Sequence, residues 1–142
     1  MGHSVIYLDA SVIVPLFLPQ PRSLEVESLL FGQEIVVSDL AAAEFSGAIA
    51  MAIRIARIGE NVGRAVLARF EDWVAGQAVM AETQSADFAA AIVLIRRIDL
   101  ALRTPDALHI AIAARLGAKL ITFDAKMATA ACALGLDFAP AR

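Results

Sequence analysis

Apolar runs that end in an acidic residue recur along this chain, and they restrict both how it can fold and what it can bind. Asp9 follows the run 5–8, and Asp124 follows the run 120–123. A carboxylate removed from water must be hydrogen-bonded, paired, protonated or bound to a metal. If the fold brings such acids together, a hard divalent cation such as Mg²⁺ or Mn²⁺ would keep them ionised. Four acids stand in apolar surroundings of this kind: Asp9, Glu44, Asp106 and Asp124.

Short β-branched runs alternate with longer stretches of helical periodicity. The runs predict buried strands at residues 5–8, 35–37, 79–81 and 119–123, with a short edge strand at 136–138. Helices are predicted at about 24–31, 39–58, 60–75, 85–97, 104–117 and 125–134. Strands that alternate with helices imply a parallel sheet covered on both faces. We therefore predict an α/β protein of one domain, residues 1–142, in which a three-layer α/β/α arrangement encloses a central parallel sheet of about four to five short strands.

Three prolines interrupt the segment after the first predicted strand. Because proline lacks a backbone N–H and clashes with the preceding helical turn, Pro15, Pro19 and Pro21 predict an irregular connection there. In open parallel sheets, ligands bind beyond the carboxyl ends of the strands. Asp9 and Asp124 both stand at such ends, so we expect the functional site at this edge of the sheet.

Composition narrows the possible functions. The 142 residues are 59% hydrophobic and only 19% charged, with a net charge of −3, so the chain is not a generally basic nucleic-acid binder. The single cysteine, Cys132, excludes an internal disulfide and a cysteine-based metal cluster. No apolar stretch reaches the roughly 18 residues that cross a bilayer, so we expect a soluble, cytoplasmic protein without membrane contact. The apolar excess suggests a surface used for association, and we expect a homodimer.

Each acid also has an ordinary structural explanation. Asp9 and Asp124 stand where a helix N-cap is common. Asp106 lies in the first turn of a predicted helix, where it would face the helix dipole and could pair with Arg103 or His109, each three positions away. Glu44 differs, because the residues three and four positions away on its helix are small or apolar and none is basic. We therefore expect a functional role for Glu44 above all.

Other polar residues give weaker signals. Ser11 and Thr122 each lie two residues from a candidate acid, where a hydroxyl could orient a carboxylate. His109, between two large aliphatic residues, is expected to be a half-buried packing side chain rather than a catalyst. Asp87 is expected to be an ordinary charge facing the dipole of its helix.

Four segments together match a known pattern in order and spacing: 8–11 (Leu-Asp-Ala-Ser), 43–45 (Ala-Glu-Phe), 102–109 (Leu-Arg-Thr-Pro-Asp-Ala-Leu-His) and 122–124 (Thr-Phe-Asp). They resemble the acidic motifs of PIN-domain ribonucleases, most closely the VapC-type toxins of bacterial toxin–antitoxin systems. The resemblance extends over the whole chain, although residues 59–76 match no family motif. It implies a Mg²⁺- or Mn²⁺-dependent endoribonuclease, dimeric and inhibited by a cognate antitoxin protein. The resemblance assigns catalytic and metal-binding roles to Asp9, Glu44, Asp106 and Asp124. It also implies a catalytic role for Ser11, which supplies the hydroxyl of the family's D-x-S/T motif.

The expected chemistry is metal-assisted hydrolysis of RNA phosphodiester bonds. In this scheme Asp9, Asp106 and Asp124 hold the main metal ion, and Glu44 holds a second ion or orients the attacking water. Two alternatives stay open. A receiver-type phosphoacceptor domain also places acids at strand ends, but it carries an acidic pair after its first strand, whereas Asp9 stands between apolar residues. A PIN-like module without catalysis, which only binds a partner, is the other.

Overall fold

The first strand of the chain lies at the centre of the sheet. In the computed structural model, which describes residues 5–140, β1 (Val5–Leu8) pairs in parallel with β2 (Glu34–Ser38) on one side and with β4 (Lys119–Thr122) on the other. The strands β3 (Ala78–Ala81) and β5 (Phe138–Pro140) form the two edges. The order is β3-β2-β1-β4-β5, and all neighbouring strands are parallel. The predicted parallel sheet is confirmed.

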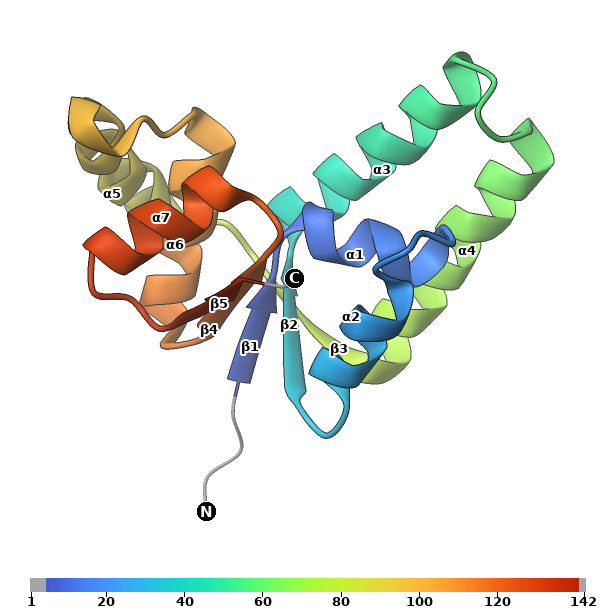
Figure 1. The fold of residues 1–142 in the computed structure, drawn as a ribbon, viewed down its shortest axis with the longest axis horizontal. Helices are drawn as coiled ribbons and strands as arrows, with labels where there is room; N and C mark the ends of the chain where they lie inside the picture. Colours follow the sequence, from blue (N-terminus) through green and yellow to red (C-terminus); the bar gives the residue numbers. More distant parts are fainter. Residues whose placement is uncertain (1–4, 141–142) are drawn as a thin grey trace.

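Helices cover both faces of this sheet (Figure 1). One layer contains α1 (Ala10–Phe17), α2 (Ser23–Leu30), α3 (Asp39–Arg54) and α4 (Glu60–Gln77). The other contains α5 (Ser85–Arg96), the 3-10 turn η1 (Ile98–Leu100), α6 (Thr104–Leu116) and α7 (Ala125–Ala133). The helices α3 and α4 form a long hairpin that projects beyond the sheet (Figure 1). The predicted three-layer α/β/α fold is confirmed.

The alternation of side chains along β1 explains why both layers are needed. Ile6 and Leu8 belong to the core beneath α1–α4, whereas Tyr7 belongs to the core beneath α5–α7. Successive side chains of a strand point to opposite faces, so a strand covered on both sides is apolar throughout. The continuous apolar runs in the sequence are therefore the signature of a central, doubly covered sheet.

The segment after β1 differs from the prediction. Instead of an irregular connection, residues Ala10–Phe17 form α1 with Pro15 inside it. Pro15 is buried, so its ring contributes to the core although its missing N–H removes one helical hydrogen bond. The helix ends soon afterwards, where the Leu18 N–H donates to the Val14 carbonyl at 2.9 Å. A short proline-containing helix is tolerated here because packing compensates for the lost bond.

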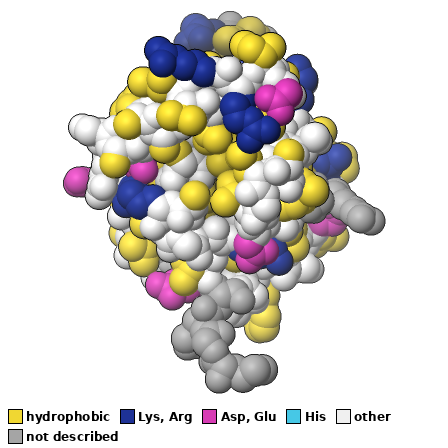
Figure 2. Space-filling model, turned by 90° about the vertical axis from the view of Figure 1, so that its left-hand side faces the viewer, with side chains coloured by type: hydrophobic (Ala, Val, Ile, Leu, Met, Phe, Trp, Pro, Cys, Tyr) yellow, Lys and Arg dark blue, Asp and Glu magenta, His cyan; other side chains and the backbone are white. Residues whose placement is uncertain are grey.

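Part of the surface is apolar. On α5 the side chains of Phe88, Ile92 and Val93 are 51%, 47% and 64% exposed. The face of the molecule that carries α5 and α7 shows hydrophobic side chains gathered across its middle, with arginines among them (Figure 2). Within residues 5–140, no helix combines the length and the apolar character needed to cross a membrane.

Candidate functional site

The carboxyl ends of β1 and β4 form the floor of an acidic cavity. Leu8 is the register partner of Ile121, so the residues that follow the two strands lie side by side. Asp9 follows β1 directly, and Asp124 is the N-cap residue of α7. The helices α3 and α6 bring in the other two acids. Asp9, Ser11, Glu44, Asp106 and Asp124 all line one cavity of about 140 Å³, together with Ala10, Arg103, His109 and Met127.

The hydrogen-bond partners of the Asp9 carboxylate are hydroxyl groups and not basic side chains. It is 4% exposed, and its Oδ1 accepts a hydrogen bond from the Ser11 hydroxyl at 2.6 Å while its Oδ2 accepts one from Thr122 at 2.7 Å. Burial raises the pKa of Asp9, although the two hydroxyl bonds act in the opposite direction. The expectation that Ser11 and Thr122 orient a carboxylate agrees with this geometry.

Asp124 and Asp106 combine a structural role with a place in the cavity. The Oδ1 of Asp124 accepts the backbone N–H groups of Lys126 and Met127 at 2.9 and 3.1 Å, which caps α7. The Oδ2 of Asp106 accepts the backbone N–H of Arg103 at 3.1 Å and its Nε–H at 3.4 Å. The structural explanations considered for these acids are therefore correct, and they coexist with exposure to the cavity.

Glu44 has a basic partner that its own helix does not supply. Its Oε1 is hydrogen-bonded to Nε2 of His109, which lies on α6 and 65 positions further along the chain. The interpretation of His109 as a half-buried packing residue is wrong. It is 1% exposed and both of its ring nitrogens are hydrogen-bonded, the second to the hydroxyl of Tyr7. A signal was present in the sequence, because His109 lies three positions after Asp106 and so shares a helix face with it.

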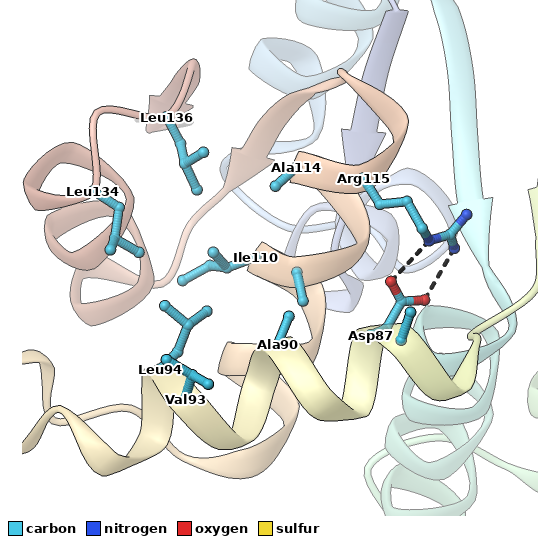
Figure 3. Close-up of a pocket in the computed structure, with 11 residues that line it drawn as sticks. Asp87, Ala90, Val93, Leu94, Ile110, Ala114, Arg115, Leu134 and Leu136 are labelled. Carbon is cyan, nitrogen blue, oxygen red and sulfur yellow. Dashed lines mark hydrogen bonds and ion pairs between the residues drawn. The ribbon is translucent and has the colours of Figure 1, made fainter.

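Asp87 lies in the first turn of α5 as expected, and its Oδ2 accepts the backbone N–H of Gln84 at 2.8 Å. It is also 1% exposed, and it accepts two hydrogen bonds from the guanidinium of Arg115 at 2.8 and 3.0 Å, which the sequence did not predict (Figure 3). Arg115 lowers the pKa of Asp87. The pair closes one end of a second concavity, a largely apolar groove of about 670 Å³ between α5, α6 and the segment after α7. This groove contains none of the four candidate acids.

The acidic cavity has the donor chemistry of a hard-cation site without a closed ligand shell. Its candidate ligands are carboxylate and hydroxyl oxygens, which suit Mg²⁺ and Mn²⁺ better than zinc. Among residues 5–140, however, no three His, Cys, Asp or Glu side chains stand close enough together to enclose an ion. Each acid instead bonds to a neighbouring donor, as expected for carboxylates that repel one another. The residue types fit a divalent cation.

Comparison with known proteins agrees with the fold. The family model described as PIN domain matches residues 6–131. One similar solved structure is VapBC2 from Rickettsia felis, bound to a DNA fragment from the promoter of the pair. It has a TM-score of 0.70 at 14% sequence identity, and the match covers 95% of this chain and 97% of that chain. VapC20 from Mycobacterium tuberculosis, described as a sarcin-ricin loop cleaving toxin, has a TM-score of 0.68 at 17% identity, covering 89% and 95%.

A toxin–antitoxin complex from Klebsiella pneumoniae has a TM-score of 0.63 at 16% identity, covering 84% of this chain and 86% of that chain. Comparison with curated proteins gave no match. Identities this low show a shared fold and nothing finer. The family-model match, by contrast, spans most of the chain and includes all four candidate acids. This chain belongs to the PIN domain family.

Proposed function

We propose that this protein is a metal-dependent endoribonuclease that acts as the toxin of a toxin–antitoxin pair. The observation that carries the proposal is the single cavity into which four carboxylates converge from the ends of β1 and β4 and from α3 and α6. Membership of the PIN domain family supports a nuclease. The solved VapC20, described as cleaving the sarcin-ricin loop, supports RNA as the substrate class.

The carboxylates of Asp9, Asp106 and Asp124 would hold the main cation, and Glu44 would hold a second ion or orient the attacking water. A bound Mg²⁺ or Mn²⁺ would supply activation of water and neutralisation of phosphate charge. Ser11 and Thr122 keep the Asp9 carboxylate in one orientation by donating to its two oxygens. Such outer partners of a ligand typically change metal affinity or activity by about 10- to 100-fold.

Arg103 is the cation best placed to meet RNA. Its side chain is 79% exposed and it lines the acidic cavity beside Asp106. An arginine at the rim can bind a phosphate through two parallel hydrogen bonds. The cavity itself repels phosphate while its acids are ionised and no metal is bound. We therefore expect the metal-free protein to bind RNA weakly.

The test is RNA cleavage by the purified protein in Mg²⁺ or in Mn²⁺, and in EDTA with and without restoration of the metal. We expect cleavage only where a divalent ion is present. Cleavage that is equal in EDTA would contradict the metal mechanism. Mapping the ends of the cleaved RNA would identify the target.

An antitoxin partner follows from the proposed toxin role, and the solved toxin–antitoxin complex from Klebsiella pneumoniae supports it. We also propose a homodimer in which a second copy covers the apolar face of α5. Phe88 and Ile92 lie one helical turn apart on this face, and a stable interface needs about 800 Å² from each partner. Phe88→Glu should convert the dimer to a monomer of about 15.0 kDa in light scattering. A wild-type protein that is already monomeric at micromolar concentration would overturn this proposal.

The alternatives are separated by the same experiments. Membership of the PIN domain family excludes the receiver-type phosphoacceptor domain. A non-catalytic PIN-like partner module stays an alternative, and it predicts antitoxin or partner binding with no RNA cleavage in any metal. Convergence of all four acids on one cavity favours the nuclease, because a module that only binds a partner has no need for it.

A further inference from the structure

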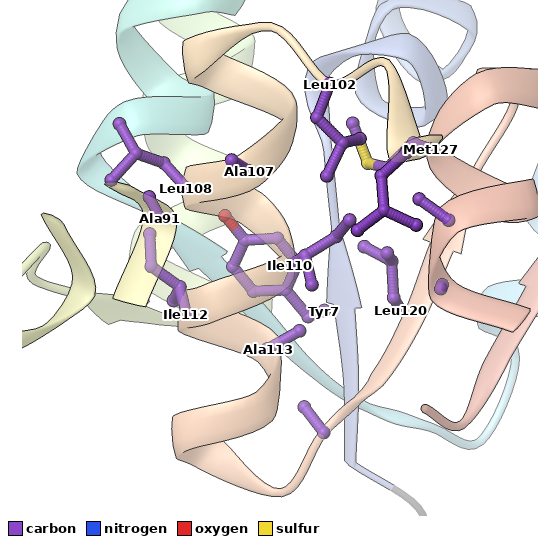
Figure 4. Close-up of a cluster of buried hydrophobic side chains, with 14 of the residues drawn as sticks. Tyr7, Ala91, Leu102, Ala107, Leu108, Ile110, Ile112, Ala113, Leu120 and Met127 are labelled. Carbon is purple, nitrogen blue, oxygen red and sulfur yellow. The ribbon is translucent and has the colours of Figure 1, made fainter. Parts of the chain in front are cut away.

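A chain of buried polar groups crosses the apolar core beneath α5–α7 and ends at Glu44. The Ser38 hydroxyl is 2.7 Å from the Tyr7 hydroxyl, which is 2.5 Å from Nδ1 of His109. The other ring nitrogen of His109, Nε2, is bonded to Glu44 Oε1. Figure 4 shows the Tyr7 ring and its hydroxyl among buried aliphatic side chains, close to α6. Tyr7 and Ser38 are completely buried.

The donors and acceptors are consistent with one direction for these hydrogen bonds. The Ser38 oxygen accepts the backbone N–H of Ala41 at 3.0 Å as the N-cap of α3, so the Ser38 proton is free to be donated to Tyr7. Burial raises the pKa of Tyr7, so its phenol keeps its proton and donates it to Nδ1 of His109. The imidazole then carries its own proton on Nε2 and donates it to Glu44. In this arrangement every donor is used once.

We propose that His109 is a positioning residue that holds the Glu44 carboxylate toward the acidic cavity. The inference rests on the proposed nuclease function, since it assigns His109 to the same site. Glu44 needs such a partner, because its helix neighbours are small or apolar and its side chain is 35% exposed. Without a partner a glutamate samples several rotamers, and ordering it at the moment of binding weakens the affinity for an ion.

The positions of Ser38, Tyr7 and His109 in the fold explain how this series of hydrogen bonds can position Glu44. Tyr7 lies two residues before Asp9 on β1, and His109 lies three residues after Asp106 on α6. Ser38 caps α3, the helix that carries Glu44. The hydrogen-bonded chain therefore joins the elements that supply three of the four acids. A purely structural role predicts that breaking it lowers stability alone. A positioning role predicts that metal affinity changes as well.

The first measurement is the affinity of the purified protein for Mn²⁺ by calorimetry. We expect His109→Leu to weaken it by about 10- to 100-fold. His109→Gln, whose amide can still donate to Glu44, should recover most of the loss. Asp87→Asn is the matched control, because it disrupts a buried polar pair far from the cavity and should lower the melting temperature without changing the Mn²⁺ affinity.

A double-mutant cycle then asks whether His109 acts through Glu44. In a Glu44→Ala background, His109→Leu should cause no further loss of Mn²⁺ affinity. A further loss of the same size would overturn the proposal, as would a folded His109→Leu protein with wild-type affinity. If His109→Leu does not fold, Tyr7→Phe replaces it, with an expected loss of up to about tenfold that Asp87→Asn does not share.

The tautomer of His109 gives a readout in the metal-free protein. The chain contains two histidines, so the ¹⁵N spectrum of the His109→Gln variant assigns the signals of the other one. We expect Nε2 of His109 to carry a proton in the wild type, and the Nδ1 signal to shift in Tyr7→Phe, which removes the hydroxyl bonded to Nδ1. A proton fixed on Nδ1, or a spectrum unchanged by Tyr7→Phe, would overturn the proposed chain.

The outcomes also separate this inference from the proposed function. Cleavage of RNA by the wild type, together with an Mn²⁺ affinity that His109→Leu leaves unchanged, would overturn the positioning role and leave the nuclease standing. Mn²⁺ binding that depends on His109, in a protein that cuts no RNA, would overturn the nuclease and support the positioning role. A wild-type protein that binds no Mn²⁺ would overturn both.

Discussion

Two buried aspartates of this chain have opposite surroundings. Asp87 accepts two hydrogen bonds from the guanidinium of Arg115, which lowers its pKa. Asp9 has only the neutral hydroxyls of Ser11 and Thr122 as partners, and burial raises its pKa. Burial of a carboxylate therefore does not by itself identify a functional site. The informative case is the buried carboxylate with neutral partners, because its charge is still to be compensated by something that binds.

The largest expected effect is the loss of cleavage in Asp9→Asn. This change removes one proposed anionic ligand with almost no change in volume, so RNA cleavage in Mn²⁺ should fall by about 100-fold. Expression of the variant should no longer arrest bacterial growth. Its melting temperature in EDTA should equal or exceed that of the wild type, because burial disfavours the charge that is removed. A folded variant that retains toxicity would remove Asp9 from the site.

Asp87→Asn should give the reverse result. The change leaves Arg115 with a weaker partner, and breaking a fully buried pair costs about 3 kcal/mol. The Arg115 side chain is 26% exposed, so solvent recovers part of this cost. Urea unfolding measures the loss, while RNA cleavage per folded molecule should stay at the wild-type level. If cleavage fell together with stability, the contrast between the two aspartates would fail.

The pH dependence of stability should also have opposite signs. The pKa of Asp87 is lowered from 3.8, so its stabilising contribution is present above that pH and is lost as the pH falls through the folded-state value. The difference in unfolding free energy between wild type and Asp87→Asn should therefore shrink in acid. The pKa of Asp9 is raised from 3.8, so the wild type loses stability relative to Asp9→Asn as the pH rises. Urea titrations in EDTA at a series of pH values measure both trends.

The smallest expected effect on stability is that of Glu44→Gln. Glu44 lies between the two extremes, since it is partly exposed and its partner is a histidine. A glutamine keeps an oxygen that can accept from Nε2 of His109, so the free energy of unfolding in EDTA should change by less than about 1 kcal/mol. Cleavage should nevertheless be strongly reduced. If Glu44→Gln lowered the free energy of unfolding by several kcal/mol and left cleavage intact, Glu44 would be a structural residue, as Asp87 is.

The sequence predicts the parallel sheet and the meeting of the acids because both follow from local patterns. Apolar runs mark the doubly covered strands, and the rule that sites lie beyond strand ends brings Asp9 and Asp124 together. The catalytic and metal-binding roles of Asp9, Ser11, Glu44, Asp106 and Asp124 stay predictions, as does the single domain of residues 1–142.

The missed features depend on pairs that are distant in the sequence. His109 and Glu44, which are hydrogen-bonded, lie 65 positions apart in the sequence, and Arg115 and Asp87 lie 28 positions apart. The periodicity of a helix predicts contacts only between residues three and four positions apart. The helix around Pro15 was missed for a related reason, since tertiary packing of its buried ring overrides the local preference of proline.

The position of β1 in the sheet ties activity to the order of synthesis. This strand precedes the other strands in the sequence, yet one of its two neighbours is β4, where Lys119 pairs with Ile6. Contacts between residues so far apart form late and slowly in folding. During synthesis Asp9 and Glu44 are made before Asp124. The cavity therefore lacks one of its four acids until Asp124 has been made. A chain made only as far as α6 therefore lacks β4 beside β1 and lacks one of the four acids, so the proposed nuclease activity would require the segment that carries Asp124.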